Sequence, residues 1–190
     1  TFKPDMWAHQ YDQQVNQVLC TVAKRDWANN SDWSNVYGLE PNYGCCTANM
    51  HQAWPKFAKS LFMGTLDGGM AAIAYGPCTV STEAWDGTPI TLAEETDYPF
   101  DEVVNLTFAM PRPSRFPLVL RIPHWAPDAE LLVNGEAQLV SGLQSFVRLD
   151  REWKDGDRVC LRFPMRPRIV PGHRGLVSVY RGPLLFGLRI

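Results

Sequence analysis

The sequence lacks long apolar runs and clusters of basic residues. No apolar run approaches the roughly 18 residues that a membrane-spanning helix requires, so the sequence predicts no membrane partner. The 18 Lys and Arg residues are scattered along the chain and are outnumbered by 20 Asp and Glu residues, which gives a net charge of −2. Nucleic-acid-binding domains concentrate basic residues on one face. We therefore expect neither a membrane nor a nucleic acid as a partner.

Cysteine is present in a small and odd number. The five cysteines are Cys20, Cys45, Cys46, Cys78 and Cys160. A small secreted scaffold held by disulfides has more cysteines at paired spacings, so we expect most of these thiols to be reduced. The adjacency of two of them, at positions 45 and 46, is the unusual feature of this set.

The chain changes character near residue 64. Before that point, apolar residues recur every three or four positions, which predicts amphipathic helices over residues 5–24 and 46–62. Pro55 lies inside the second segment and is expected to kink that helix or to shift its start. Two helices cannot bury their apolar faces alone, so we expect them to pack on a sheet or on helices from outside this chain.

After residue 64 the apolar period is two, which predicts strands with one buried face. The predicted inward-facing residues of the clearest strands are Val104, Leu106, Phe108 and Met110, and then Val159, Leu161 and Phe163. Asn134-Gly135 and Asp155-Gly156 are typical of hairpin turns. Many short strands with such turns favour a β-sandwich, although the same pattern is compatible with a barrel.

The most informative stretch is residues 42–49, where Cys45 and Cys46 follow Gly44 at the predicted start of a helix. The N–H groups at a helix start stabilise anions, so this position favours the thiolate form of a cysteine. A thiolate is both a nucleophile and a soft ligand for zinc. Adjacent cysteines are also compatible with inert packing or with a strained vicinal disulfide. Spacing alone does not choose among these alternatives.

Further motifs follow one another along the chain. After residues 42–62 come Leu120-Arg121-Ile122-Pro123-His124-Trp125, Val133-Asn134-Gly135-Glu136, Trp153-Lys154-Asp155-Gly156-Asp157, Phe163-Pro164-Met165 and Tyr180-Arg181-Gly182-Pro183-Leu184. Taken in order, these motifs resemble glycoside hydrolase family 127, the β-L-arabinofuranosidase family, and its relatives, and the resemblance covers nearly the whole chain.

This resemblance implies a fold and a domain division. The family's catalytic domain is an (α/α)6 barrel followed by β-sandwich material. We therefore expect α+β content, with residues 1–64 forming the C-terminal helices of the barrel. Residues 65–190 are expected to form an antiparallel β-sandwich, truncated at its C-terminus.

The resemblance also implies a retaining glycosidase that depends on zinc. In the family, three cysteines and a glutamate hold the zinc ion, the first cysteine of the adjacent pair is the nucleophile, and a separate glutamate is the acid/base. Carried over by position, Cys45 becomes nucleophile and zinc ligand, and Cys46 a zinc ligand. The other two ligands come from an upstream Glu-x-Cys motif, and no Glu in this sequence is followed two positions later by Cys.

We therefore expect a fragment of a larger glycosidase that acts on arabinofuranosides or related plant glycans and is inactive in isolation. The sequence begins at Thr1 without an initiator Met and ends in an apolar strand pattern, as expected of a piece of a longer polypeptide. The alternative is a non-catalytic carbohydrate-binding or structural β-sandwich with a structural zinc or an inert cysteine pair. Measuring the zinc content of the full-length protein would distinguish a zinc-dependent glycosidase from a non-catalytic module without metal.

Overall fold

The computed structural model of the chain describes residues 21–22, 32–33, 36–38, 49, 51–140 and 145–187. The chain divides into two compact units. One consists of Thr1–Phe57, Ile169–Val179 and Leu185–Ile190, and the other of Ala58–Arg168 and Tyr180–Leu184. Most of the described residues belong to the second unit. The predicted division into residues 1–64 and 65–190 concerns domains of a longer protein and stays a prediction.

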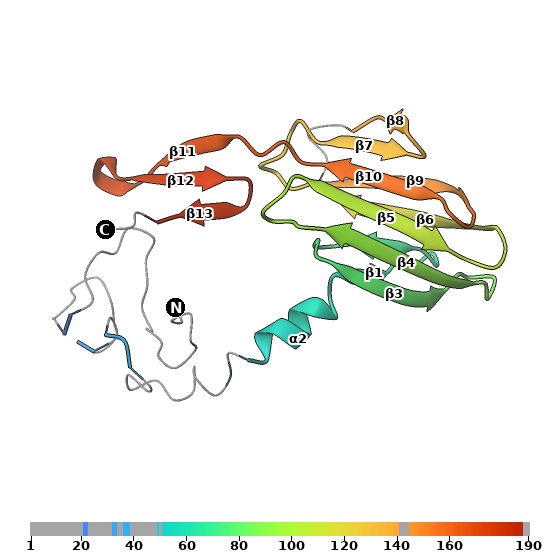
Figure 1. The fold of residues 1–190 in the computed structure, drawn as a ribbon, viewed down its shortest axis with the longest axis horizontal. Coiled ribbons are helices and arrows are strands. Elements are labelled where there is room, and N and C mark those ends of the chain that lie inside the picture. The colour runs from blue at the N-terminus through green and yellow to red at the C-terminus, as the bar shows by residue number, and fades with distance from the viewer. Residues whose placement is uncertain are drawn as a thin grey trace. The chain divides into compact units, whose positions relative to one another are not determined.

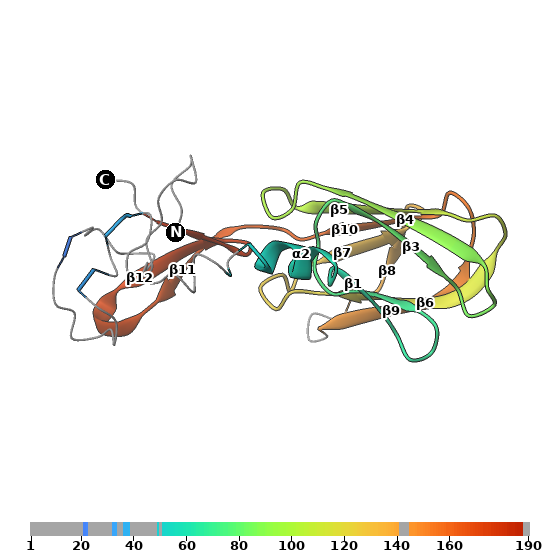
Figure 2. The ribbon, with the colours of Figure 1, turned by 90° about the horizontal axis from the view of Figure 1, so that it is seen from below.

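Two sheets make up the second unit, as far as its described residues show. The first sheet has the strand order β1 (Phe62–Gly64), β2 (Met70–Ala72), β6 (Ser114–Arg121) and β9 (Phe146–Trp153). The second sheet has the order β3 (Cys78–Glu83), β4 (Pro89–Thr96), β5 (Val103–Ala109), β10 (Arg158–Arg162), β7 (Glu130–Val133) and β8 (Glu136–Gln138). Figures 1 and 2 show these sheets as two layers, with β6 and β9 in one and β4, β5 and β10 in the other.

The predicted inward faces of the strands are correct. Val104, Leu106 and Phe108 of β5 are at most 1% exposed, and so are Val159 and Leu161 of β10. The two strands pair antiparallel, with Leu106 opposite Val159 and Val104 opposite Leu161, so both buried rows point into the same core. Alternation in the sequence is therefore the direct cause of the two-layer packing, because each strand has one apolar face to remove from water.

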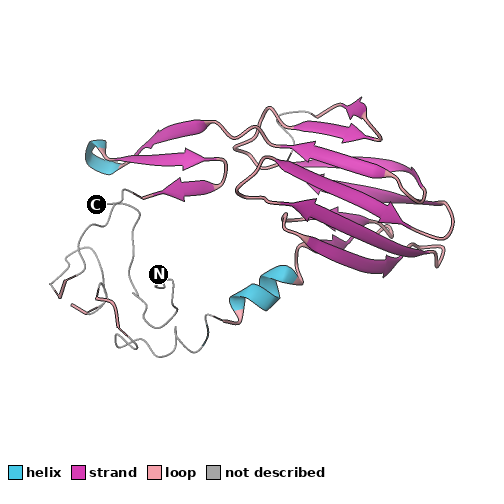
Figure 3. Cartoon of the chain, in the orientation of Figure 1, coloured by secondary structure: helices cyan, strands magenta, loops and turns pink. Residues whose placement is uncertain are grey.

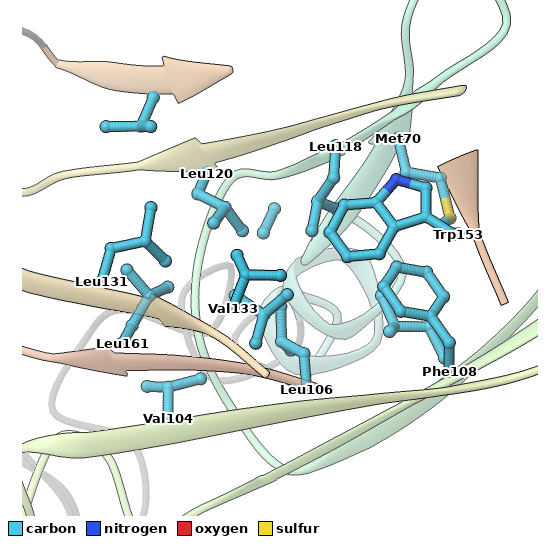
Figure 4. Packing of buried hydrophobic residues seen from close by; sticks show 14 of the residues in the cluster. Met70, Val104, Leu106, Phe108, Leu118, Leu120, Leu131, Val133, Trp153 and Leu161 are labelled. Atoms are coloured by element: carbon cyan, nitrogen blue, oxygen red, sulfur yellow. The ribbon is translucent and has the colours of Figure 1, made fainter. Parts of the chain in front are cut away.

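Aromatic side chains fill one end of the core between the layers. Trp153, the last residue of β9, is fully buried and packs against Phe108 of the opposite sheet, with ring centroids 4.6 Å apart. Its indole Nε1 donates a hydrogen bond of 3.0 Å to the carbonyl oxygen of Phe116. Figure 4 shows the indole above Phe108 and beside Met70. The polar atom of this large side chain is thus satisfied inside an apolar layer.

The first predicted hairpin turn is correct. Asn134 and Gly135 join β7 to β8 and have φ angles of 52° and 84°, as a two-residue type I′ turn requires. The Asn134 side chain accepts a hydrogen bond of 2.8 Å from the Arg158 backbone and donates one of 2.9 Å to Asp157 Oδ1. The other oxygen of this buried carboxylate accepts from the Lys154 backbone at 3.0 Å. One carboxylate therefore ties this turn to the start of β10.

The second predicted hairpin, at Asp155-Gly156, is a turn but not a hairpin. It joins β9 of the first sheet to β10 of the second, and these two strands do not pair. Asp155 Oδ1 accepts a hydrogen bond of 3.1 Å from the Met110 backbone, and the Gly156 N–H donates one of 2.9 Å to the carbonyl of Phe108. The turn crosses between the layers and is anchored to the end of β5.

The predicted fold class is wrong for the described part of the chain. In place of C-terminal helices of an (α/α)6 barrel, the described residues contain one α-helix, α2 (Ala53–Ala58), which has six residues. Figure 3 shows that strands dominate the rest. The strand pairing also departs from an all-antiparallel sandwich, because β2 and β6 pair in parallel.

The reason for the missing barrel helix is visible in α2 itself. None of its residues is buried, and Trp54 and Phe57 are 67% and 52% exposed. An apolar period of 3.6 stabilises a long helix only where another surface covers the apolar face. Pro55 falls in the first turn, where its missing N–H removes no helical hydrogen bond. The other predicted helix, over residues 5–24, lies outside the described residues apart from residues 21–22.

A third sheet has the strand order β11 (Pro167–Pro171), β12 (Val177–Arg181) and β13 (Leu184–Phe186), and the 3-10 helix η1 (His173–Gly175) lies between β11 and β12. Across the described ranges, no helix combines the length and the apolar character that a membrane span needs.

Truncating Phe108 to Ala should lower the free energy of unfolding by about 3–5 kcal/mol, because the residue is 1% exposed and packs on Trp153. Urea denaturation of the variant and the parent chain measures this loss. Ser81→Ala, at an exposed position of β3, is the control and should change the stability by less than about 0.5 kcal/mol. Equal losses in the two variants would contradict the assigned core.

Candidate functional site

The paired cysteines of the sequence prediction lie outside the described residues. The structure therefore does not place Cys45 or Cys46, and their assigned roles as nucleophile and zinc ligands stay predictions. Over the ranges that are described, no group of three or more His, Cys, Asp and Glu side chains is arranged to hold a metal ion.

Two other cysteines are described, and both are free thiols in strands of the second sheet. Burial raises the pKa of the Cys78 thiol in β3, and the negative charge of Glu94 raises it further. Burial also raises the pKa of the Cys160 thiol in β10, with a smaller contribution from the charge of Glu130. A raised pKa keeps a thiol protonated near neutral pH and makes it a poorer nucleophile and metal ligand. Neither cysteine therefore resembles the predicted reactive pair.

Two of the sequence motifs, the one that ends at Met165 and the one that contains Arg181, both contact the Glu102 carboxylate. Its Oε1 accepts a hydrogen bond of 2.8 Å from the Met165 backbone and lies 3.9 Å from Arg181 Nη2. Arg181 also donates to the carbonyl of Phe100 at 3.1 Å. Gly182 has a φ of 56°, and a Cβ there would lie 2.6 Å from the sulfur of Met165. Gly182 is thus required for the close packing of this turn against Met165.

The described residue with the most perturbed carboxyl group is Glu94 of β4. It is 3% exposed and occupies an inward position of the strand, after Ile90 and Leu92. Its Oε1 accepts a hydrogen bond of 2.7 Å from the Gly76 backbone. Its Oε2 is buried without a hydrogen-bond partner in the described part of the chain. Burial raises the pKa of Glu94 to about 7, and the single bond from Gly76 opposes this only in part.

The surroundings of Glu94 are apolar and phenolic. Tyr75 is buried and donates a hydrogen bond of 2.7 Å to the carbonyl of Arg121. Burial raises the pKa of Tyr75, and the charge of Glu94 raises it further. The rings of Tyr75 and Tyr98 lie 6.0 Å apart in an edge-on arrangement. A carboxyl group with such a pKa suits proton transfer, but its 3% exposure leaves no access for a substrate. We interpret Glu94 as a buried acid that affects stability.

A pocket of about 670 Å³ lies on the second sheet, and it has a mixed polar and apolar lining. Strands β4, β5, β10 and β7 and the turn after β7 line it. Its polar side chains include those of Glu95, Asn105, Thr107 and Arg158, and Cys160 also lines it. Carboxylate, amide, hydroxyl and guanidinium groups can bind hydroxyl-rich or other polar ligands.

Sequence reasoning singled out neither Glu94 nor this pocket. Glu94 could have been found, because it continues the period-two pattern of Ile90 and Leu92 and is therefore expected on the buried face. The pocket could not have been found in this way. Its lining comes from separate stretches around residues 95, 105–107, 132–135 and 158–160, and no local pattern shows which of these strands are neighbours.

Replacing Glu94 with Gln should remove a pH dependence of stability. The folded pKa of about 7 exceeds the ordinary value of 4.5, so the folded state binds the proton more tightly and loses stability as the pH rises between these two values. The full loss is on the order of 3 kcal/mol, since each unit of pKa difference corresponds to about 1.4 kcal/mol. Urea unfolding at about pH 5 and about pH 8 should show Glu94→Gln more stable than the parent at the higher pH only.

The control for that experiment is Glu95→Gln, because Glu95 is the next residue along β4 and is exposed. This variant should keep the pH dependence of the parent chain. If Glu94→Gln also keeps it, ionisation of the buried carboxyl group does not cause the loss of stability.

Comparisons with known proteins agree with the motifs. The family model described as "Beta-L-arabinofuranosidase, GH127 middle domain" matches residues 69–165. The solved structure of a GH127 beta-L-arabinofuranosidase from Geobacillus stearothermophilus T6 is similar to the chain, with a TM-score of 0.67 and 30% sequence identity; the match covers 74% of this chain and 23% of that one. A search of curated protein sequences returned no match.

Two further solved structures share the fold at 24% identity. A protein described as a glycoside hydrolase has a TM-score of 0.78 and covers 97% of this chain and 30% of its own. A GH127 beta-arabinofuranosidase has a TM-score of 0.65 and covers 74% of this chain and 25% of its own. The chain thus spans 23 to 30% of the lengths of these three proteins. Because the GH127 middle-domain model matches just over half of this sequence, the chain belongs to the GH127 β-L-arabinofuranosidase family.

Proposed function

We propose that the chain is part of a retaining glycoside hydrolase that acts on arabinofuranosides, with Cys45 as its nucleophile. The observation that carries this proposal is the match of residues 69–165 to the GH127 middle domain. The adjacent cysteines lie upstream of that domain, in the order expected from the motifs. The two-layer sandwich then serves as the domain that follows the catalytic residues in the chain.

The donor atoms of the cysteine pair fit zinc. Two thiolates are soft ligands of the kind that tetrahedral zinc sites use. Cys78 and Cys160 do not add to such a site, because each lies within a paired strand and burial raises its thiol pKa. Cys45 and Cys46 would therefore supply two ligands, and the remaining two would come from outside this chain. When bound, zinc would keep the thiolates deprotonated and tune their nucleophilicity.

In the proposed reaction, the Cys45 thiolate attacks the anomeric carbon of the arabinofuranoside. A carbon–sulfur bond forms as the bond from that carbon to the leaving oxygen breaks, and the leaving oxygen takes a proton from a carboxylic acid outside this chain. Water then displaces the sulfur, which restores the thiolate, and the same carboxylate takes the proton from water. Two displacements at one carbon retain its configuration, as in glycosidases that use two carboxyl groups.

Two substitutions in the full-length enzyme test the roles of the cysteines. Cys45→Ser should abolish turnover of an aryl arabinofuranoside even where part of the zinc is retained, because a serine without an adjacent base is a far weaker nucleophile. Cys46→Ser should act mainly by lowering the zinc content. Steady-state kinetics and metal analysis of both variants measure these effects. A Cys45→Ser enzyme with near-parental activity would overturn the assignment.

The isolated 190-residue chain provides a second check. It should show no turnover, because its sequence contains no Glu-x-Cys motif that could complete the metal site.

A substrate-like electrophile added to the full-length enzyme should label Cys45, as located by mass spectrometry of the digest. Label on a carboxylate, with Cys45 untouched, would contradict the cysteine mechanism.

A further inference from the structure

A row of outward-facing side chains crosses four neighbouring strands of the second sheet. Glu95 of β4 lies opposite Asn105 of β5, Asn105 lies opposite Cys160 of β10, and Cys160 lies opposite Leu132 of β7. Figure 1 shows these four strands side by side. The row ends on β7 at an apolar residue, so the polar side chains extend from β4 to β10, over two inter-strand spacings of about 4.8 Å, or roughly 10 Å. In the adjacent row, Thr107 lies opposite Arg158.

The polar side chains of these two rows have unused hydrogen-bonding groups. Within the described residues, the side chains of Glu95, Asn105, Thr107 and Arg158 make no hydrogen bond or ion pair with the rest of the chain. All four line the pocket of about 670 Å³, a size typical of small-molecule sites, which range over about 300–1,000 Å³. These hydrogen-bonding groups are thus not used by any described residue and are open to water or a ligand.

The next arginine along the same strand behaves differently. Arg162 projects from the same outer face of β10 as Arg158, two strand periods away. It lies 3.5 Å from the Glu102 carboxylate and 3.5 Å from the Glu130 carboxylate. Among the described residues, one arginine of β10 is thus paired with two carboxylates, whereas the guanidinium of the arginine in the pocket has no such partner.

The chemistry of the pocket suits a neutral ligand with many hydroxyl groups. A sugar hydroxyl both donates and accepts, and the pocket offers an accepting carboxylate, a donating guanidinium, and an amide and a hydroxyl that do both. The one negative and one positive side chain leave no net charge to select an ion. None of the described residues that line it is aromatic, so hydrogen bonds rather than ring stacking would determine affinity and selectivity. The polar span of roughly 10 Å is longer than one sugar ring.

We propose that the outer face of the second sheet binds an oligosaccharide through Glu95, Asn105, Thr107 and Arg158. The choice of a carbohydrate rests on the proposed function, since the glycan that the enzyme trims is the polymer that an accessory site would hold. The surface is a binding site only, and no bond of the ligand is broken there.

Titration of the purified 190-residue chain with short arabino-oligosaccharides tests this proposal. Amide resonances of residues 95, 105–107 and 158–160 should shift saturably in heteronuclear NMR spectra. Arg158→Ala and Asn105→Ala should each weaken binding, the former by at least about tenfold, because a hydrogen bond to a charged group is lost. Arg162→Ala is the matched control and should bind within about twofold of the parent chain. Absence of saturable shifts, or equal losses in Arg158→Ala and Arg162→Ala, would overturn the proposal.

Cys160 provides an internal probe in the pocket. Its alkylation by iodoacetamide, followed by peptide mass spectrometry, should slow at least about threefold when oligosaccharide saturates the site. Alkylation of Cys78, which lies in β3 and does not line the pocket, should be unchanged. A Cys160 that reacts in the 190-residue chain but not in the full-length protein without sugar would mean that protein covers this face, and that result would overturn the proposal.

The proposed catalytic function and the proposed oligosaccharide site can be tested independently of each other. Cys45→Ser in the full-length enzyme should abolish turnover and leave oligosaccharide binding at Arg158 unchanged. No saturable binding in an enzyme whose turnover depends on Cys45 overturns the accessory site alone. Binding that depends on Arg158 in a protein without turnover supports the accessory site and overturns the proposed catalytic function alone.

Discussion

The packing of Trp153 against Phe108 is the contact on which the rest of the sandwich depends. Trp153 ends β9 in one sheet, and Phe108 lies near the end of β5 in the other, so the contact between their rings, which are tilted by 32°, joins the two layers. The indole also donates to the carbonyl of Phe116, which fixes its orientation. A large aromatic pair that is fully buried contributes more than its area alone, because ring geometry adds to the hydrophobic term.

The position of Trp153 also determines where the chain crosses to the second sheet. The turn that follows is held by the carboxylate of Asp157, which accepts from the Lys154 backbone and from the side chain of Asn134. β10 begins directly after this turn and pairs with β5 on one side and β7 on the other. These contacts at the core therefore set the register of β10. That register determines which residues of β5, β10 and β7 lie opposite one another on the outer face.

This arrangement gives the two faces of the second sheet different properties. The buried residues in the strands of this sheet are apolar except at Glu94, where a carboxyl group stands in the position of the next apolar residue and has one oxygen without a partner among the described residues. On the outer face, Arg162 pairs with two carboxylates, whereas Arg158 pairs with none in the described part of the chain. The burial of Glu94 and the different pairing of the two arginines both depend on which residues the strand register places opposite each other. Amino-acid composition determines neither feature.

Much of the fold could be predicted because its signals are local. Alternating apolar residues such as Val104 and Leu106 identified the buried face, and Asn134-Gly135 identified a hairpin, since both depend on residues within a few positions. The prediction failed where a distant surface decides the outcome. The 3.6-residue period before residue 64 predicted a long helix, but α2 has six residues and its Trp54 is 67% exposed. The Asp155-Gly156 turn connects two sheets, which turn chemistry alone cannot distinguish from a hairpin.

The sequence by itself determined the strand faces, the positions of the turns, the adjacency of Cys45 and Cys46, and the order of motifs that places the chain in the GH127 family. Only the tertiary structure decided which polar groups find partners. Gly76 donates to Glu94 across 18 positions, and Met165 donates to Glu102 across 63. Periodicity and turn propensity act between near neighbours, whereas burial, ion pairing and the lining of a pocket depend on which distant strands lie side by side.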